Sequence, residues 1–221
     1  FQHRTVRAGL NILLTDYDRL YTRDYIMPFG LLRENRGGAK RAEIIVVTKC
    51  PLEMSVEEKQ VLTNELQPLP HQKLYFSGIR YKNIYPLSTF APNINKDTHV
   101  VLVTGIANAT PLIKHLKNNF AEVFHLEYKD HHYYTYDDLK EMQEAFVNMP
   151  TENKILVTTE KDASRLMLLQ DKILEYQLPF FAQGIGVEIL FEEDEQFNGE
   201  IISFVQSIIP PIVEEVIAEE V

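Results

Sequence analysis

The segment "YKDHHYYTYDDL", residues 128–139, places an acidic residue and two histidines directly before a helix-start signal. Asp130 and His131 follow a predicted strand, at the carboxyl edge where open α/β sheets bind their ligands. A histidine there could orient or relay a proton for a carboxylate elsewhere in the fold. Two neighbouring histidines on an extended segment point to opposite sides, so at most one is expected to serve a site. A surface histidine that caps the helix or packs on tyrosine also explains the pattern.

Two further functions are open for this segment. A metal-dependent hydrolase could use Asp130 and His131, but a metal site needs at least one more ligand at a suitable spacing. The sequence nominates no such ligand. A non-catalytic α/β interaction domain, in which "KDHHYY" contacts a partner, is the other alternative.

Other charged residues could bind phosphate. Arg33 and Glu34 follow a proline and glycine turn in "FGLLRENR". Arginine can form paired hydrogen bonds with phosphate, and an adjacent carboxylate can hold the arginine in place. His3 and Arg4 in "FQHR" are further candidates. Ordinary solvated side chains explain each of these groups as well.

Three segments invite a phosphate-loop interpretation. "RGGAKRAE" lacks the first glycine and the Ser or Thr that complete a Walker motif, so it predicts a glycine turn before a strand. "TGIANATP" and "VTTEKDASRL" each lead from a strand into a helix, whose first backbone N–H groups could receive an anion. A capped helix is the simpler explanation. In the second segment Thr158 or Thr159 would be the cap, with Lys161 and Asp162 in the first turn.

The elements that must position these residues are those of a mainly parallel α/β layered fold, because short β-branched runs alternate with amphipathic stretches. The predicted strands are residues 10–15, 44–48, 73–77, 100–104, 123–126 and 155–158. Helix-start signals occur at Ser55, at Thr110 with Pro111, and at Thr135. Residues 80–98 contain prolines and no clear period, which predicts a long loop or linker.

Composition limits the class of protein. A chain of 221 residues with 45% hydrophobic residues can form one large or two small domains. No apolar run spans a bilayer, the single Cys50 fits a reducing compartment, and the formal charge of −10 argues against a non-specific nucleic-acid binder. A predicted strand follows closely on Phe1, so we expect an upstream part to be missing. The acidic end "IIPPIVEEVIAEEV" predicts a short helix or a frayed tail.

Several motifs occur together in a specific order. "FQHR", "MPFGLLRE", "KRAEIIVVTKCP", "TGIAN", "DHHYYTYDDL" and "VTTEKDASRL" follow one another between residue 1 and about residue 170. Together they resemble the tetraacyldisaccharide 4'-kinase family, the lipid A 4'-kinases of Gram-negative bacteria. "TKCP" and "HHYYTYDD" look most like the Bacteroidetes branch. Each motif is weak by itself, but their order makes the resemblance specific.

The resemblance implies an enzyme that transfers the γ-phosphate of ATP, with Mg2+, to the 4'-hydroxyl of a tetraacyl disaccharide 1-phosphate, a lipid A precursor. It implies a peripheral protein at the cytoplasmic side of the inner membrane, with no nucleic-acid partner. The membrane contact, the phosphate loop with its lysine, the catalytic aspartate and the magnesium-binding aspartate pair would lie upstream of Phe1. The chain alone would then be soluble and inactive.

The fold implied is a P-loop-type, three-layer α/β lobe joined to a second α/β lobe. Residues 1–50 would be the remainder of the nucleotide and lipid lobe with the hinge. Residues 51–221 would be the second lobe and its acidic tail. By matching motif positions, the resemblance gives roles to individual residues and implies no metal ligand in this chain.

In that reading, His131 holds and tunes the catalytic aspartate, with Asp130 beside it. Arg33 meets phosphate charge near the hinge, and Glu34 orients the arginine. His3 matches the histidine beside the magnesium aspartates. "MPFGLLRE" has phenylalanine where many members have alanine, which puts only local packing in doubt.

Overall fold

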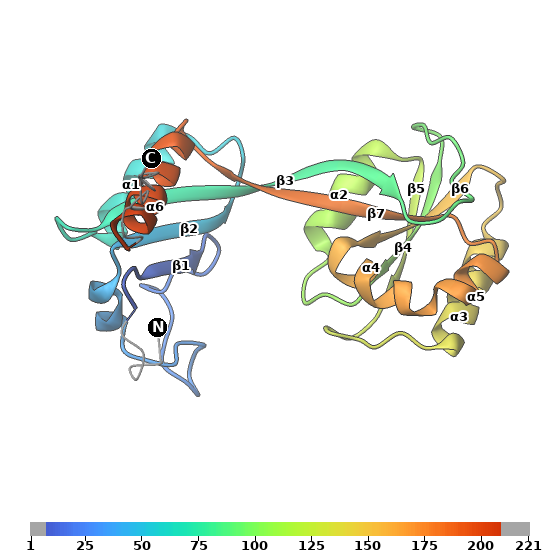
Figure 1. The fold of residues 1–221 in the computed structure, drawn as a ribbon, viewed down its shortest axis with the longest axis horizontal. Helices are drawn as coiled ribbons and strands as arrows, with labels where there is room; N and C mark the ends of the chain where they lie inside the picture. Colours follow the sequence, from blue (N-terminus) through green and yellow to red (C-terminus); the bar gives the residue numbers. More distant parts are fainter. Residues whose placement is uncertain (1–7, 209–221) are drawn as a thin grey trace, which may run out of the picture. The chain divides into compact units, whose positions relative to one another are not determined.

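The computed structural model describes residues 8–208, and the chain divides into two compact units (Figure 1). Unit 1 comprises Phe1–Arg80 and Val187–Val221, and unit 2 comprises Tyr81–Gly186. The expected helix or tail at the acidic end falls on residues 209–221 and lies outside the described residues, as does His3. The boundary predicted from the sequence lies after residue 50, and the assignment of the two segments to kinase lobes stays a prediction.

Seven strands are hydrogen-bonded in the order β1-β2-β3-β7-β6-β4-β5. They are β1 (Ile12–Asp16), β2 (Ile44–Cys50), β3 (Lys73–Pro86), β4 (His99–Thr104), β5 (Glu122–Glu127), β6 (Lys154–Thr159) and β7 (Phe180–Ile189). Pairing is parallel from β1 to β3 and from β7 to β5. The Leu87 N–H donates to Phe180 O and the Leu190 N–H to Phe76 O, so β3 and β7 run antiparallel. The predicted mainly parallel α/β fold is confirmed.

The helical segments fill the connections between these strands. They are η1 (Arg36–Arg41), α1 (Val56–Leu66), α2 (Thr110–Asn119), α3 (Tyr136–Asn148), α4 (Glu160–Leu166), η2 (Met167–Leu169), α5 (Gln170–Glu175) and α6 (Asp194–Ile208). Within residues 8–208, no helix has both the length and the apolar character that crossing a membrane requires.

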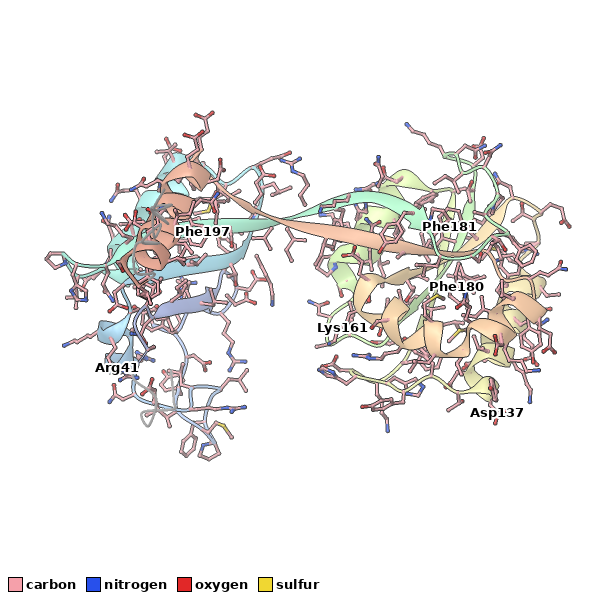
Figure 2. The ribbon with its side chains drawn as sticks, in the orientation of Figure 1. Arg41, Asp137, Lys161, Phe180, Phe181 and Phe197 are labelled. Atoms are coloured by element: carbon pink, nitrogen blue, oxygen red, sulfur yellow. The ribbon has the colours of Figure 1, made fainter. Side chains whose placement is uncertain are left out.

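Unit 1 has a core on each face of its strands, because successive residues of a strand point to opposite sides. Val47 and Phe76 pack with Leu62 of α1. The neighbouring residues Val46 and Tyr75 lie in a second cluster, together with side chains of α6. The Tyr75 ring meets the ring of Phe197, labelled on α6 in Figure 2, edge to face, with 5.2 Å between centroids. Helices α1 and α6 therefore cover opposite faces.

Unit 2 is a three-layer αβα sandwich. Val101 and Leu156 pack against helices α3, α4 and α5, whereas Val100 and Ile155 pack against α2. The adjacent residues Phe180 and Phe181 of β7, labelled in Figure 2, belong to these two separate clusters. The central strands β4 and β6 are thus buried on both faces, which explains why they read as continuous apolar runs.

Most predicted helix starts are confirmed. Ser55 caps α1 and Thr135 caps α3, each through a reciprocal capping box with the residue three positions later. Thr159, not Thr158, caps α4 by accepting a hydrogen bond from the Asp162 N–H. These side chains satisfy backbone donors that a helix leaves unpaired at its start.

The start of α2 differs from the prediction by one position. Its N-cap is Ala109, which has no side-chain cap, and Thr110 is the first helical residue. The Thr110 N–H donates instead to Asn108 Oδ1 at 3.0 Å. The asparagine supplies the acceptor that the sequence analysis assigned to threonine.

The predicted loop at residues 80–98 is partly wrong. β3 continues to Pro86, because the second half of this strand lies beside β7. Gln183 of β7 also donates from Nε2 to Lys82 O at 2.6 Å. Strand β7 and helix α6 were not predicted. Half-exposed residues in β3 and glycines in β7 break the hydrophobic pattern that identifies a strand.

Candidate active site

The candidate site lies at the carboxyl edge of the sheet in unit 2. β4 pairs in parallel with both β5 and β6, so the ends of these three strands meet at one edge. The segments that follow them begin at Gly105, at Tyr128 and at Glu160. Residues about thirty positions apart in sequence are therefore brought together, as expected for a ligand edge in an α/β sheet.

Asp130 and His131 form the centre of a tight turn and not the extended segment predicted from the sequence. The His132 N–H donates to Lys129 O at 3.0 Å, and the His131 N–H donates to Gly105 O at 3.1 Å. His131 has a φ of 62°, in the left-handed region, which costs a non-glycine residue about 1 kcal/mol. The turn leaves 70% of the His131 side chain exposed.

Gly105 permits this turn to approach the sheet edge. A Cβ atom at this position would lie 3.1 Å from Lys129 O and 3.3 Å from Asp162 Oδ1. Both are tighter than ordinary contacts of a side-chain carbon. Glycine is therefore the residue that fits where three segments converge.

Two cations and a carboxylate surround the His131 ring. Arg165 Nη2 lies 3.4 Å from Nδ1, and Lys161 Nζ, labelled in Figure 2, lies 3.4 Å from Nε2. Asp130 Oδ2 is 3.7 Å from Nε2. A neutral imidazole accepts at only one nitrogen, so Arg165 and Lys161 cannot both donate to it. When Nδ1 accepts from Arg165, the Nε2–H is left to face a carboxylate.

Asp162 is the buried anchor of this arrangement. Its side chain is fully buried and accepts hydrogen bonds from the Gly105 N–H at 3.1 Å, from Thr159 Oγ1 at 2.8 Å and from Arg165 Nη1 at 3.0 Å. It thereby ties the loop after β4 to the start of α4 and fixes the guanidinium that reaches His131. From its place in the sequence, Asp162 was predicted only to be a charge in the first turn of a helix.

His132 belongs to the helix start and not to the exposed site. Its Nε2 lies 3.0 Å from Asp138 Oδ2, and its ring stacks on Tyr128 with 4.9 Å between centroids. Burial acts to raise the pKa of Asp138, but hydrogen bonds from His132 and Thr135 outweigh it, so the pKa is lowered. His131 therefore remains as the candidate catalytic histidine.

The other predicted site residues lie in unit 1 or outside the described residues. Glu34 accepts a hydrogen bond from Arg41 Nη2, labelled in Figure 2, at 2.7 Å. Arg33 is exposed and forms no hydrogen bond or ion pair with the described part of the chain. The ion pair seen for Glu34 is thus with Arg41, and the roles of Arg33, Glu34 and His3 stay predictions.

The described residues do not form a magnesium site. Between residues 8 and 208, no group of three or more His, Cys, Asp or Glu side chains is arranged to hold a metal ion. Asp130 and His131 therefore gain no third ligand there, and a metal-dependent hydrolase has no support from this geometry.

These features define the class as an α/β protein with a histidine, a carboxylate and two cations at the carboxyl edge of a parallel sheet. The family model described as Tetraacyldisaccharide-1-P 4'-kinase matches residues 1–205. The chain belongs to this family, which confirms the resemblance found in the sequence motifs.

Curated relatives carry the same description. The chain is 39% identical to a tetraacyldisaccharide 4'-kinase of Bacteroides thetaiotaomicron over 220 residues, covering 93% of the chain and 57% of the relative. It is 39% identical to one of Bacteroides fragilis with the same coverage, and 35% identical to one of Flavobacterium psychrophilum, covering 94% and 58%. The chain thus spans less than two thirds of these relatives. No solved structure matches it.

Proposed function

We propose that the chain is the C-terminal part of an ATP-dependent lipid kinase that phosphorylates the 4'-position of a tetraacyl disaccharide 1-phosphate in lipid A biosynthesis. The observation that carries this proposal is the family match over residues 1–205. The names of the curated relatives support the same reaction. The complete protein would act peripherally at the cytoplasmic side of the inner membrane.

The proposed role of His131 is to hold and tune the catalytic aspartate of the complete enzyme. Its exposed ring can offer one N–H to a carboxylate while the other nitrogen accepts from Arg165. An imidazole in this position would orient the carboxylate that removes the proton from the attacking hydroxyl. Asp130 Oδ2 lies 3.7 Å from His131 Nε2. Asp130 would therefore compete for the N–H of His131 or relay its proton.

ATP and Mg2+ are proposed to bind mainly through parts of the relatives that this chain does not cover. The described residues present neither a complete Walker motif nor a set of metal ligands. Phosphoryl transfer depends on positioning and charge neutralisation, which those elements provide. We therefore expect the 221-residue chain alone to be inactive, and ATP-dependent phosphorylation by it would contradict this expectation.

The test is phosphorylation of the tetraacyl disaccharide 1-phosphate by the complete gene product. We expect His131→Ala to lower kcat by about 10²-fold or more, the range for loss of a general-base partner. His71→Ala is the matched control, because His71 is also exposed but lies in a turn of unit 1. It should retain wild-type activity.

The possible outcomes separate the reaction from the role of the histidine. No activity in a folded, complete wild-type protein would overturn the kinase and favour an interaction domain. Full activity in His131→Ala would keep the kinase and make His131 an ordinary surface residue.

A further inference from the structure

Asp162 is connected to His131 by two separate routes within unit 2. Asp162 Oδ2 accepts from the Gly105 N–H at 3.1 Å, and Gly105 O accepts from the His131 N–H at 3.1 Å. Asp162 Oδ1 accepts from Arg165 Nη1 at 3.0 Å, and Arg165 Nη2 lies 3.4 Å from His131 Nδ1. The first route holds the backbone of the turn, and the second reaches the ring. One buried carboxylate is therefore linked to both parts of the exposed histidine.

The guanidinium of Arg165 is held firmly in place. The Arg165 side chain is only 18% exposed, and its partner Asp162 is fully buried. Nη1 also donates to His132 O at 3.5 Å. The ion pair persists because a buried carboxylate that lost its cation would keep an uncompensated charge. Since a guanidinium is planar and rigid, fixing Nη1 on Asp162 also fixes the direction in which Nη2 points toward His131.

The contact with Arg165 determines which ring nitrogen of His131 carries the proton. Arginine has only donors and stays charged in proteins, so the nitrogen that faces it must be the acceptor. That nitrogen is Nδ1. A neutral imidazole has one donor and one acceptor, so the proton then lies on Nε2.

Lys161 is the competing cation at the ring. Its Nζ lies 3.4 Å from His131 Nε2, but it lies equally close, at 3.4 Å, to Asp130 Oδ1. The Lys161 side chain is 46% exposed, so its flexible stem can turn the ammonium to Asp130 or to water. Arg165 has no such freedom because a buried carboxylate holds it. The arginine contact at Nδ1 therefore prevails over the lysine contact at Nε2.

We propose that Arg165, aligned by Asp162, is a positioning residue that holds His131 by Nδ1 and so directs its Nε2–H toward the catalytic carboxylate. This inference rests on the proposed function, because that carboxylate belongs to the complete kinase. Neither Arg165 nor Asp162 touches the substrate in this role. An imidazole without the arginine would rotate and exchange tautomers, and it would present the correct N–H in only part of the molecules.

The first test is NMR of the imidazole nitrogens in the 221-residue chain, with His131→Ala to assign the resonances. At a pH where the ring is neutral, Nδ1 of His131 should have the chemical shift of a nitrogen without a proton. Arg165→Met should move this resonance toward the average of two exchanging tautomers, because nothing then reserves Nδ1 as the acceptor. Lys161→Met should leave it in place.

The second test is the phosphorylation rate of the complete gene product. Arg165→Met should lower kcat by about tenfold with little change in KM, because the residue orients the histidine and does not bind substrate. Arg165→Lys should lower kcat as well, since a single ammonium cannot contact both Asp162 and His131. In a His131→Ala background, Arg165→Met should cost nothing further, because residues that act as a unit are not additive.

Asp162→Asn separates the two routes to His131. The asparagine oxygen can still accept from the Gly105 N–H, while its NH2 group faces Arg165, which has no acceptor. The turn should therefore remain, with an unchanged backbone amide resonance for His131. The ring should lose its partner, and the Nδ1 shift and kcat should follow those of Arg165→Met.

The matched control removes a similar ion pair elsewhere in unit 2. Lys172 of α5 pairs with Glu175, three positions later, as Arg165 pairs with Asp162 three positions earlier. Lys172→Gln should change neither the Nδ1 shift of His131 nor kcat. Circular dichroism should show that each variant is folded. If Asp162→Asn does not fold, the two Arg165 variants still decide the outcome.

Three results would overturn the proposal. One is an unchanged Nδ1 resonance in Arg165→Met, and another is wild-type kcat in that variant. The third is an equal loss of kcat on Arg165→Met with and without His131, which would make the arginine merely structural. An inactive complete wild-type protein would overturn the kinase proposal instead. The NMR comparison requires no phosphorylation, so it would still support or overturn the contact between Arg165 and His131.

Discussion

His131 and His132 are neighbours in sequence, yet different interactions fix them. His132 is held by its side chain, through Asp138 and the Tyr128 ring. His131 is held by its backbone, through a turn that donates to Gly105 O and leaves the ring exposed. The pattern "DHH" predicted that at most one histidine would serve a site, and the family resemblance assigned that role to His131, whose ring the turn leaves exposed.

Cys50 gives the clearest prediction at the scale of a single residue. Burial raises the pKa of its thiol from 9.0 to about 11. Below pH 9 both the folded and unfolded chains keep the proton, so this group adds no pH dependence there. Above pH 9 the unfolded state loses the proton first, and the free energy of unfolding falls as the pH rises toward 11. Two pKa units correspond to about 2 to 3 kcal/mol.

The measurement is urea unfolding at several pH values between about 8 and 11, with Cys50→Ala as the control. The alanine variant loses core volume at every pH, but it lacks the thiol that titrates. Its stability should therefore fall less steeply with pH than that of the wild type. Equal slopes for the two proteins would show that Cys50 does not contribute to the alkaline loss of stability.

At the scale of secondary structure, the candidate site is assembled by strand pairing. The sequence predicted β4, β5 and β6 because each contains a short run rich in apolar residues, and it placed His131 after β5. It could not show that Lys161 and Arg165 approach the same ring, because that follows from the pairing of β4 with both neighbours. Local pattern identifies elements, whereas their order in the sheet depends on contacts between distant residues.

The same limit explains the elements that were missed. The second half of β3 and strand β7 are stabilised by each other, and neither has the alternation of a half-buried strand. Helix α6 is identified by its packing on β2 and β3, where Phe197 meets Tyr75. The second half of β3, strand β7 and helix α6 are therefore stabilised more by their tertiary contacts than by the intrinsic secondary-structure propensity of their residues.

The start of α3 supports a prediction about two matched capping boxes. Asp138 accepts from the Thr135 N–H at 2.7 Å and lies 3.0 Å from His132 Nε2, in a part-buried contact. Glu58 at α1 accepts from the Ser55 N–H and has in place of the histidine only an exposed, long hydrogen bond from Tyr17 Oη at 3.5 Å. Asp138→Ala should therefore lower the free energy of unfolding by about 1 kcal/mol more than Glu58→Ala, because the part-buried His132 contact is shorter than the exposed Tyr17 contact of Glu58.

Urea unfolding of the two variants measures this difference directly. Thr135→Ala and Ser55→Ala are the companion substitutions and should each cost about 1 kcal/mol, as loss of a helix cap does. Equal costs for Asp138→Ala and Glu58→Ala would mean that the His132 contact adds nothing to stability.

At the scale of the whole molecule, the two units differ in how the chain builds them. Unit 2 is one continuous segment, and helices within it cover both faces of its sheet. We therefore expect residues 81–186 to fold alone, with dispersed amide resonances and cooperative unfolding. Residues 1–80 alone should not fold, because the cores of unit 1 also need Leu190 and Phe197.

Expression of the two segments tests this expectation. A collapsed spectrum for residues 81–186 would show that unit 2 depends on unit 1. A well-dispersed spectrum for residues 1–80 would show that β7 and α6 are dispensable to that unit.

The discontinuous origin of unit 1 also sets an order of events during translation. Residues 1–80 leave the ribosome before unit 2, but Phe197 and Ile201, which complete one of their cores, are synthesised more than a hundred residues later. Unit 2 is complete before then. Unit 1 is thus completed after unit 2, although most of it precedes unit 2 in the chain. Meanwhile the apolar strands of residues 1–80 need protection from aggregation, so we expect chaperones to engage this segment.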